Sequence, residues 1–99
     1  MNCLNLNESF ENYRVKPCEK SLAELLQASQ PFIYGIALKV SRHSQDAEDL
    51  TQEVLIKVIH HINELPQNIN FGGWLNRVSL NAAIDHYRQS QHVKALLPK

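Results

Sequence analysis

Residues 46–62 read DAEDLTQEVLIKVIHHI, and their spacing decides the fold class. Apolar residues recur along this stretch at the period of one helix face: Leu50, Val54, Leu55, Val58, Ile59 and Ile62. The acidic residues at its start complement the positive end of a helix dipole. The stretch therefore predicts an amphipathic helix that begins near Asp46, buries its apolar side and is stopped by Pro66.

A second helical pattern precedes this stretch. Its apolar residues keep one phase, with Ser29 at the intervening position: Leu22, Leu25, Leu26, Ile33, Ile36, Ala37 and Val40. Ser21 followed by Glu24 has the spacing of a capping box, so we expect the helix to begin at Ser21. Pro31 removes one backbone hydrogen bond, but the apolar phase continues across it. We therefore predict one kinked helix rather than two.

A third helix is predicted after the loop 66–73, where asparagine and glycine favour turns. It opens between Phe71 and Trp74 and runs to about Ser90. Its expected buried residues are Leu75, Val78, Ala82 and Tyr87. No alternating pattern typical of strands competes with the helical ones, so the predicted fold class is all-α, a compact bundle of three to four helices.

The bundle is expected to span residues 21–91. Residues 1–20 are rich in Asn and Glu, and we interpret them as a polar N-terminal leader with a short helix near residues 10–15. Residues 92–99 end in Leu-Leu-Pro-Lys and are interpreted as the start of a linker.

The composition is that of an ordinary globular domain, with 43% hydrophobic residues in a chain of 99. No apolar run approaches the roughly 18 residues that cross a bilayer, and no secretory leader is visible. These features predict a cytoplasmic protein without a membrane partner. Cys3 and Cys18 are expected to be reduced thiols there, and without a CxxC pair they predict no zinc site.

The net charge of zero hides an uneven distribution. Residues 46–70 carry five acidic residues and one basic residue, whereas residues 71–99 carry four basic residues and one acidic residue. An acidic middle and a basic end favour two partners of opposite charge.

Catalysis finds little support in the sequence. His60, His61 and Glu64 have helical spacing that could hold a metal, but the Glu-x-x-His motif of di-metal carboxylate sites does not occur. Neighbouring histidines near the end of a helix more often complement its dipole. We therefore expect no enzyme, no catalytic residue, no metal site and no cofactor.

Three stretches, in this order, resemble region 2 of the sigma-70 family of sigma factors, in particular the extracytoplasmic-function (ECF) class. They read DAEDLTQEV at 46–54, FGGWLNRV at 71–78 and NAAIDHYR at 81–88. The segment IYGIALK at 33–39 also fits the first long helix of that family. The resemblance covers about residues 22–91, and three motifs at the right separations make it specific.

The resemblance implies two tasks for a helical module. One face binds the clamp helices of the largest subunit of RNA polymerase, and the other recognises and helps to open the promoter −10 element by capturing bases of the non-template strand. It implies polymerase contacts for Asp49, Gln52 and Glu53, and helical spacing adds Ile56 to the same sector. Acidic side chains around an exposed aliphatic residue suit a basic, amphipathic helical partner. The alternative is an ordinary solvated acidic face.

The third helix and the loop before it carry the expected DNA contacts. Cations neutralise phosphates, amides read base edges and aromatic rings stack on unpaired bases. By resemblance, the loop 65–70 forms part of a pocket for a flipped-out base. The expected DNA-binding residues are Asn68, Asn70, Phe71, Trp74, Arg77, Asn81 and Arg88. Alternatives remain open: Trp74 as a core aromatic, Asn81 as a bond between helices, and Arg88 as a helix pair with Asp85.

The sequence departs from the family pattern in two ways. The end of the third helix carries few basic residues, which predicts weaker DNA binding. A complete sigma factor also has a second domain, region 4, for the −35 element, and no residues follow Lys99 to supply it. The chain is then either a domain excised from a longer protein or a truncated family member with altered function, and the linker-like ending favours excision. The alternative function is an interaction module that binds polymerase or an anti-sigma factor without recognising a promoter.

Overall fold

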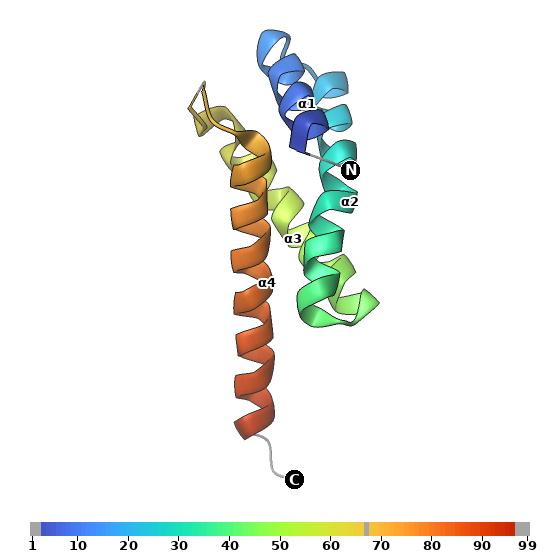
Figure 1. Ribbon diagram of the computed structural model, residues 1–99, viewed down its shortest axis with the longest axis vertical. Helices are drawn as coiled ribbons and strands as arrows, with labels where there is room; N and C mark the ends of the chain where they lie inside the picture. Colours follow the sequence, from blue (N-terminus) through green and yellow to red (C-terminus); the bar gives the residue numbers. More distant parts are fainter. Residues whose placement is uncertain (1–2, 67, 97–99) are drawn as a thin grey trace.

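The computed structural model describes the backbone of residues 3–66 and 68–96, and the side chains of residues 6–66 and 68–89. Its helices are α1 (Cys3–Val15), α2 (Glu19–Ser41), α3 (Ser44–His61), the short 3-10 helix η1 (Ile62–Glu64) and α4 (Phe71–Leu96). Figure 1 shows α3 behind and between α2 and α4, with α1 near the start of α4. The described residues form no strand, and the predicted all-α bundle is confirmed.

Helix α2 contributes a buried row of residues spaced four apart: Leu25, Ser29, Ile33 and Ala37. The Ser29 hydroxyl donates a hydrogen bond of 2.8 Å to the Leu25 carbonyl oxygen, so its burial leaves no unpaired donor. The helix continues through Pro31, which lies on the exposed side. The prediction of one helix across this proline is confirmed.

Helix α3 presents Leu50, Val54 and Val58 to the core, as its period predicts. The expectation that Ile59 is buried is wrong, because this side chain is 44% exposed. Successive residues of a helix point about 100° apart, so the position after a buried valine turns away from the core. Tyr87 is also 48% exposed rather than buried. It lies in the second half of α4, whose C-terminal end extends beyond the other helices (Figure 1).

The first turn of α2 differs from the predicted capping box. The helix begins at Glu19, so Ser21 lies inside the first turn instead of capping it. The Ser21 hydroxyl accepts a hydrogen bond of 3.1 Å from the Cys18 amide and donates one of 2.9 Å to the Lys16 carbonyl. It also lies 3.5 Å from the Cys18 sulfur, and this hydrogen bond lowers the pKa of the exposed thiol.

Both ends of the chain are more helical than expected. Residues 3–15 form α1 rather than only a short helix near residues 10–15, and Leu6 and Phe10 are buried in the core. Helix α4 continues to Leu96, through most of the segment interpreted as a linker. The side chains of Cys3 and of residues 90–99, and the structure of residues 97–99, lie outside the described residues.

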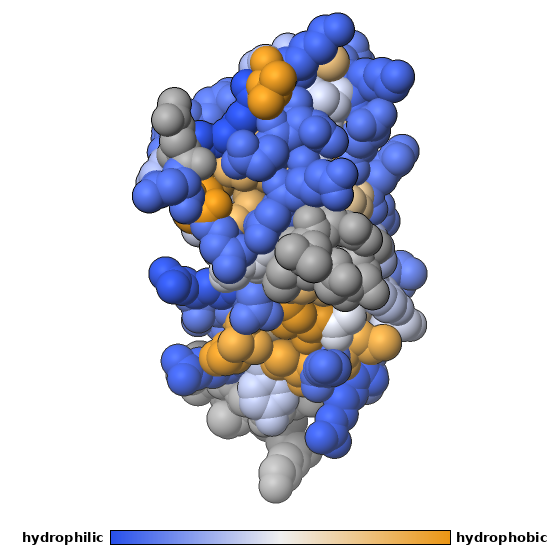
Figure 2. Space-filling view, turned by 45° about the horizontal axis from the view of Figure 1, so that its top comes forward, coloured by the Kyte–Doolittle hydropathy of each residue, from blue (hydrophilic) through white to orange (hydrophobic). Residues whose placement is uncertain are grey.

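The surface is mixed in polarity. In Figure 2 the upper part is mainly hydrophilic, and most of the visible apolar side chains gather lower down. The large hydrophobic residues that the described surface exposes are Val15, Leu38, Ile56, Ile59, Leu80 and Tyr87. In the part of the chain that the structure describes, no helix combines the length and apolarity required to cross a membrane.

Candidate nucleic-acid interface and docking face

The start of α4 is capped by Asn70. The Asn70 side-chain oxygen accepts a hydrogen bond of 3.1 Å from the Gly73 amide, and its backbone carbonyl accepts one of 2.9 Å from the Trp74 amide. This is the expected geometry of an asparagine N-cap, which satisfies amide groups that have no partner within the helix. The cap holds the loop before α4 and the first turn of α4 in one arrangement.

A cavity of about 350 Å³ opens beside this cap. Its lining residues, which define what we call the α4 cavity, are Ile69, Asn70, Gly73, Trp74 and Arg77. The volume is at the lower end of the range typical of small-molecule sites. An indole, an amide and a guanidinium therefore surround one hollow, together with an aliphatic side chain.

The structure brings together three of the residues predicted to bind DNA. Asn70, Trp74 and Arg77 line the α4 cavity. Trp74 is half-buried and packs against Phe71 with ring centroids 5.6 Å apart, so it belongs partly to the core and partly to the cavity. Asn68 is exposed but does not line the cavity.

The other predicted contacts lie farther along α4. Asn81 is exposed one helical turn beyond Arg77, on the same side of the helix. Arg88 is also exposed, but it lies eleven residues beyond Arg77, roughly 16 Å along the helix axis. Arg88 could therefore reach a phosphate but not a base held in the α4 cavity.

Phe71 must be removed from the predicted DNA contacts. Its side chain is 0% exposed and stacks on Phe10 of α1, with ring centroids 4.8 Å apart and planes inclined by 12°. A ring enclosed in this way cannot touch a nucleic acid. Phe71 anchors the first turn of α4 to the core, and stacked pairs of this kind contribute about 0.5–1.5 kcal/mol beyond the area they bury.

Helix α1 supplies contacts that the sequence interpretation missed. Asn7 bonds to Asn70 and to the Gly72 amide, and the Tyr13 hydroxyl donates a hydrogen bond of 3.2 Å to the side chain of Asn63. The Arg14 guanidinium lies over the Phe10 ring, 4.6 Å from its centroid.

Arg14 also donates hydrogen bonds to the carbonyl oxygens of Leu65 and Pro66. The loop that borders the α4 cavity is therefore held from one side by α1. The signal that could have located this helix is the spacing of Leu6, Phe10 and Tyr13, which is four and then three residues.

An exposed side of α3, with Glu53 at its edge toward α4, carries the second predicted surface, which we call the docking face: Asp49, Gln52, Glu53 and Ile56. All four side chains are exposed, and Ile56 is 54% accessible. Only Asp49 has a side-chain hydrogen bond among the described residues, a long one of 3.5 Å from Gln45. The two carboxylates are therefore available to an approaching partner.

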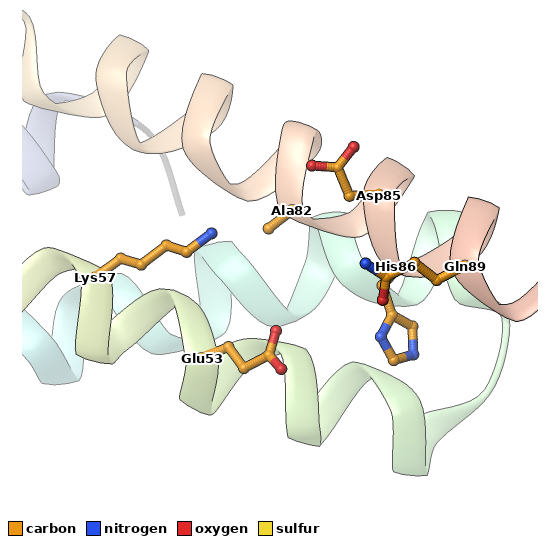
Figure 3. A pocket seen from close by; sticks show the side chains of 6 residues that line it. All are labelled: Glu53, Lys57, Ala82, Asp85, His86 and Gln89. Carbon is orange, nitrogen blue, oxygen red and sulfur yellow. The ribbon is translucent and has the colours of Figure 1, made fainter.

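A polar groove of about 240 Å³ lies between α3 and α4. Figure 3 shows Glu53 and Lys57 from α3, with the His86 ring extending from α4 into the gap. Asp85 and Gln89 also line the groove. Because acidic and basic groups alternate in it, the groove has no single charge preference. Among the described residues, no group of three His, Cys, Asp or Glu side chains could hold a metal ion.

The family model for Sigma-70 region 2 matches residues 25–93. The chain belongs to the sigma-70 region 2 family. The match covers most of α2, all of α3 and most of α4, and it includes the docking face and every lining residue of the α4 cavity. It begins after α1, so the contacts that this region 2 domain receives from α1 lie outside the matched residues.

Curated relatives agree with this assignment. The chain is 34% identical to ECF RNA polymerase sigma factor SigE of Mycolicibacterium smegmatis over 72% of its own length and 27% of that protein. It is 28% identical to the probable RNA polymerase sigma factor RfaY of Xanthomonas campestris pv. campestris, over 76% of this chain and 19% of that protein. It is 27% identical to ECF RNA polymerase sigma factor SigW of Bacillus subtilis, over 79% of this chain and 44% of that protein.

These relatives support the ECF class within the family. The region 2 domain spans between about a fifth and somewhat less than half of their length. No solved structure matches the chain.

Proposed function

We propose that this region 2 domain acts in transcription initiation as part of an RNA polymerase sigma factor, without chemistry of its own. In this role α3 binds the clamp helices of the largest polymerase subunit, and the start of α4 captures a base of the non-template strand of the −10 element. The domain would work in the cytoplasm, where polymerase and promoter meet, and an anti-sigma factor is a further candidate partner.

The α4 cavity is the observation that carries the proposal. A base held out of the stack loses its stacking and pairing energy, and new stacking and hydrogen-bonding partners on a protein offset that loss. Trp74 provides an aromatic surface, Asn70 an amide and Arg77 a cation for the adjacent phosphate, and all three line one hollow. Asn81 extends the same side of α4 by one turn and would contact the neighbouring nucleotide.

The docking face supports the other half of the proposal. Asp49 and Glu53 are exposed carboxylates one helical turn apart, and Ile56 exposes an aliphatic surface on the same side. Complementary charge accelerates the encounter with a basic helix, and the apolar contact then slows dissociation.

Two binding measurements test the proposal together. Fluorescence anisotropy would follow binding of the domain to single-stranded oligonucleotides of the −10 type, and a pull-down would follow binding to the isolated clamp helices. We expect both to be positive, with the oligonucleotide signal dependent on sequence. In assays of the polymerase complex, Arg77→Ala and Asn81→Ala should reduce promoter opening more than clamp binding. Equal losses in both assays would point to misfolding and contradict the assigned roles.

One observation favours the alternative of an interaction module without promoter recognition. The described side chains of α4 include only two cations, Arg77 and Arg88, and Asp85 lies between them. Few cations mean few phosphate contacts and weak electrostatic binding. Clamp binding without any sequence-dependent binding of oligonucleotides would establish this alternative.

A further inference from the structure

Asn7 of α1 bonds to the N-cap residue of α4, Asn70, and to the second residue of that helix, Gly72, more than sixty positions away in the sequence. The Gly72 amide donates a hydrogen bond of 2.8 Å to the Asn7 side-chain oxygen. The Asn7 side-chain nitrogen donates one of 3.1 Å to the side-chain oxygen of Asn70. Asn70 oxygen also accepts the hydrogen bond from the Gly73 amide at 3.1 Å. Figure 1 shows α1 close to this end of α4.

Donor and acceptor chemistry fixes the orientation of both side-chain amides. A backbone amide can only donate, so the atoms that face the Gly72 and Gly73 amides must be oxygens. The nitrogen of Asn7 then points toward Asn70, where it meets that oxygen. An amide oxygen has two lone pairs, and in Asn70 one is used by Gly73 and the other by Asn7.

The nitrogen of Asn70 is the atom left for an occupant of the α4 cavity. Asn70 and Gly73 both line the cavity, and a Cβ added at Gly73 would lie 3.4 Å from the Asn70 side-chain nitrogen. Among the described residues, no acceptor is bonded to this nitrogen. The other polar side chains of the lining, Trp74 and Arg77, have donors and no acceptor.

We propose that Asn7 is a positioning residue that locks the Asn70 amide, so that the α4 cavity selects a base with an exposed carbonyl oxygen over adenine. The inference rests on the proposed capture of a base and adds its chemical preference. Cytosine, thymine and guanine have a carbonyl oxygen that can accept from the Asn70 nitrogen. Adenine has none. Its N1 and N7 can accept, but both lie next to the exocyclic amino group, which would face the donors of Trp74 and Arg77 in the lining.

The test uses the full chain and oligodeoxyadenylate strands that carry one guest nucleotide, with binding measured by fluorescence anisotropy. We expect at least one strand with a dC, dT or dG guest to bind about fivefold more tightly than the all-adenine strand, the order expected from one hydrogen bond. A strand with an abasic guest should bind no better than the all-adenine strand. A wild-type chain that favours adenine would overturn the inference.

Asn7→Asp separates positioning from simple structural support. The new carboxylate still accepts from the Gly72 amide, but it cannot donate to Asn70 and instead attracts the Asn70 nitrogen. The amide of Asn70 is then no longer locked: it gives up its cap bond to the Gly73 amide when its nitrogen turns toward the new carboxylate, and its oxygen then faces the α4 cavity. We expect the preference for a carbonyl-bearing guest to disappear or to reverse toward adenine. Asn12→Asp places the same charge on an exposed position of α1 and should keep the wild-type preference.

Amide hydrogen exchange follows the same contact without DNA. The Gly72 amide is bonded to Asn7 and to no carbonyl of its own helix, so Asn7→Ala should accelerate its exchange, whereas Asn7→Asp should preserve its protection. Equal exchange in all three chains would overturn the inference.

The outcomes distinguish the two proposals. A wild-type chain that binds no strand would remove the proposed function together with the preference built on it. A wild-type chain that discriminates guests, with a preference unchanged in Asn7→Asp, would overturn the role of Asn7 alone.

Discussion

The docking face on α3 and the cavity at the start of α4 are built in different ways. Every residue of the docking face lies on two turns of one helix, and its side chains project into solvent. The α4 cavity is formed by a loop and a helix start that α1 holds in place through Asn7, Phe10 and Arg14. The first surface needs only a folded α3, whereas the second needs contacts between residues fifty to sixty-five positions apart.

This difference predicts how each surface responds to change. A substitution on the docking face should alter binding and leave the fold intact, because all four of its side chains are exposed. A substitution in α1 should alter the α4 cavity without touching any ligand. The two surfaces can therefore be separated experimentally.

The largest effect is expected from Phe10→Ala. Phe10 is 1% exposed and stacks on Phe71, and truncation of a buried phenylalanine costs about 3–5 kcal/mol. Urea unfolding followed by circular dichroism should report this loss of unfolding free energy. Val15→Ala is the matched control, because Val15 lies on the same helix and is 83% exposed. If the two variants are equally stable, α1 does not support the start of α4 in solution.

The next effect tests the docking face alone. Asp49→Lys combined with Glu53→Lys should weaken binding to the clamp helices about a hundredfold, because like charges now face each other across the interface. Unfolding free energy and oligonucleotide binding should not fall. The control, Glu11→Lys with Glu24→Lys, makes the same change in net charge at exposed positions of α1 and α2. Clamp affinity that survives the first pair, measured by surface plasmon resonance, would remove the docking face from the proposal.

The same contrast explains how much the sequence could predict. The buried row Leu50, Val54 and Val58 follows from the helical period, which also predicts the exposed side of α3 that carries the docking face. The binding role of that face came from the family resemblance and stays a prediction. Phe71 was misassigned because its position in the FGGW motif says nothing about the ring that packs on it. That ring belongs to Phe10, in a segment whose asparagines and glutamates suggested a polar leader.

Errors in the helix ends have a related cause. A capping box at Ser21 and one at Cys18 differ by less than one turn, and only the hydrogen bond from the Cys18 amide distinguishes them. Tyr87 has the spacing of a core residue, but it is 48% exposed, so the other described helices cover it only in part. Local periodicity predicts which side of a helix is apolar, but not how far its neighbours reach.

A pair of glycine substitutions tests whether a base enters the α4 cavity. Gly73→Ala adds a methyl group to the lining, 3.4 Å from Asn70, and should weaken strand binding about tenfold because the base loses space. Its unfolding free energy should not fall. Gly35→Ala, in the interior of α2 with no atom within 4 Å of the new Cβ, should raise the unfolding free energy by about 0.5–1 kcal/mol and leave strand binding unchanged. Equal strand affinity in both variants would show that the base does not enter this cavity.

The smallest expected change is in the salt dependence of strand binding when either of the two described arginines of α4 is replaced. Each phosphate contact contributes about 0.7 to the slope of log affinity against log salt for single strands. Arg77→Ala and Arg88→Ala should each lower this slope by about that amount, because each removes one cation. Only Arg77→Ala should also weaken the preference for the captured base, because Arg77 lines the α4 cavity and Arg88 does not. Lys39→Ala, at an exposed position of α2, should change neither quantity. A salt slope that is the same in all three variants would mean that α4 does not follow the phosphate backbone, and strand binding would then rest on base contacts alone.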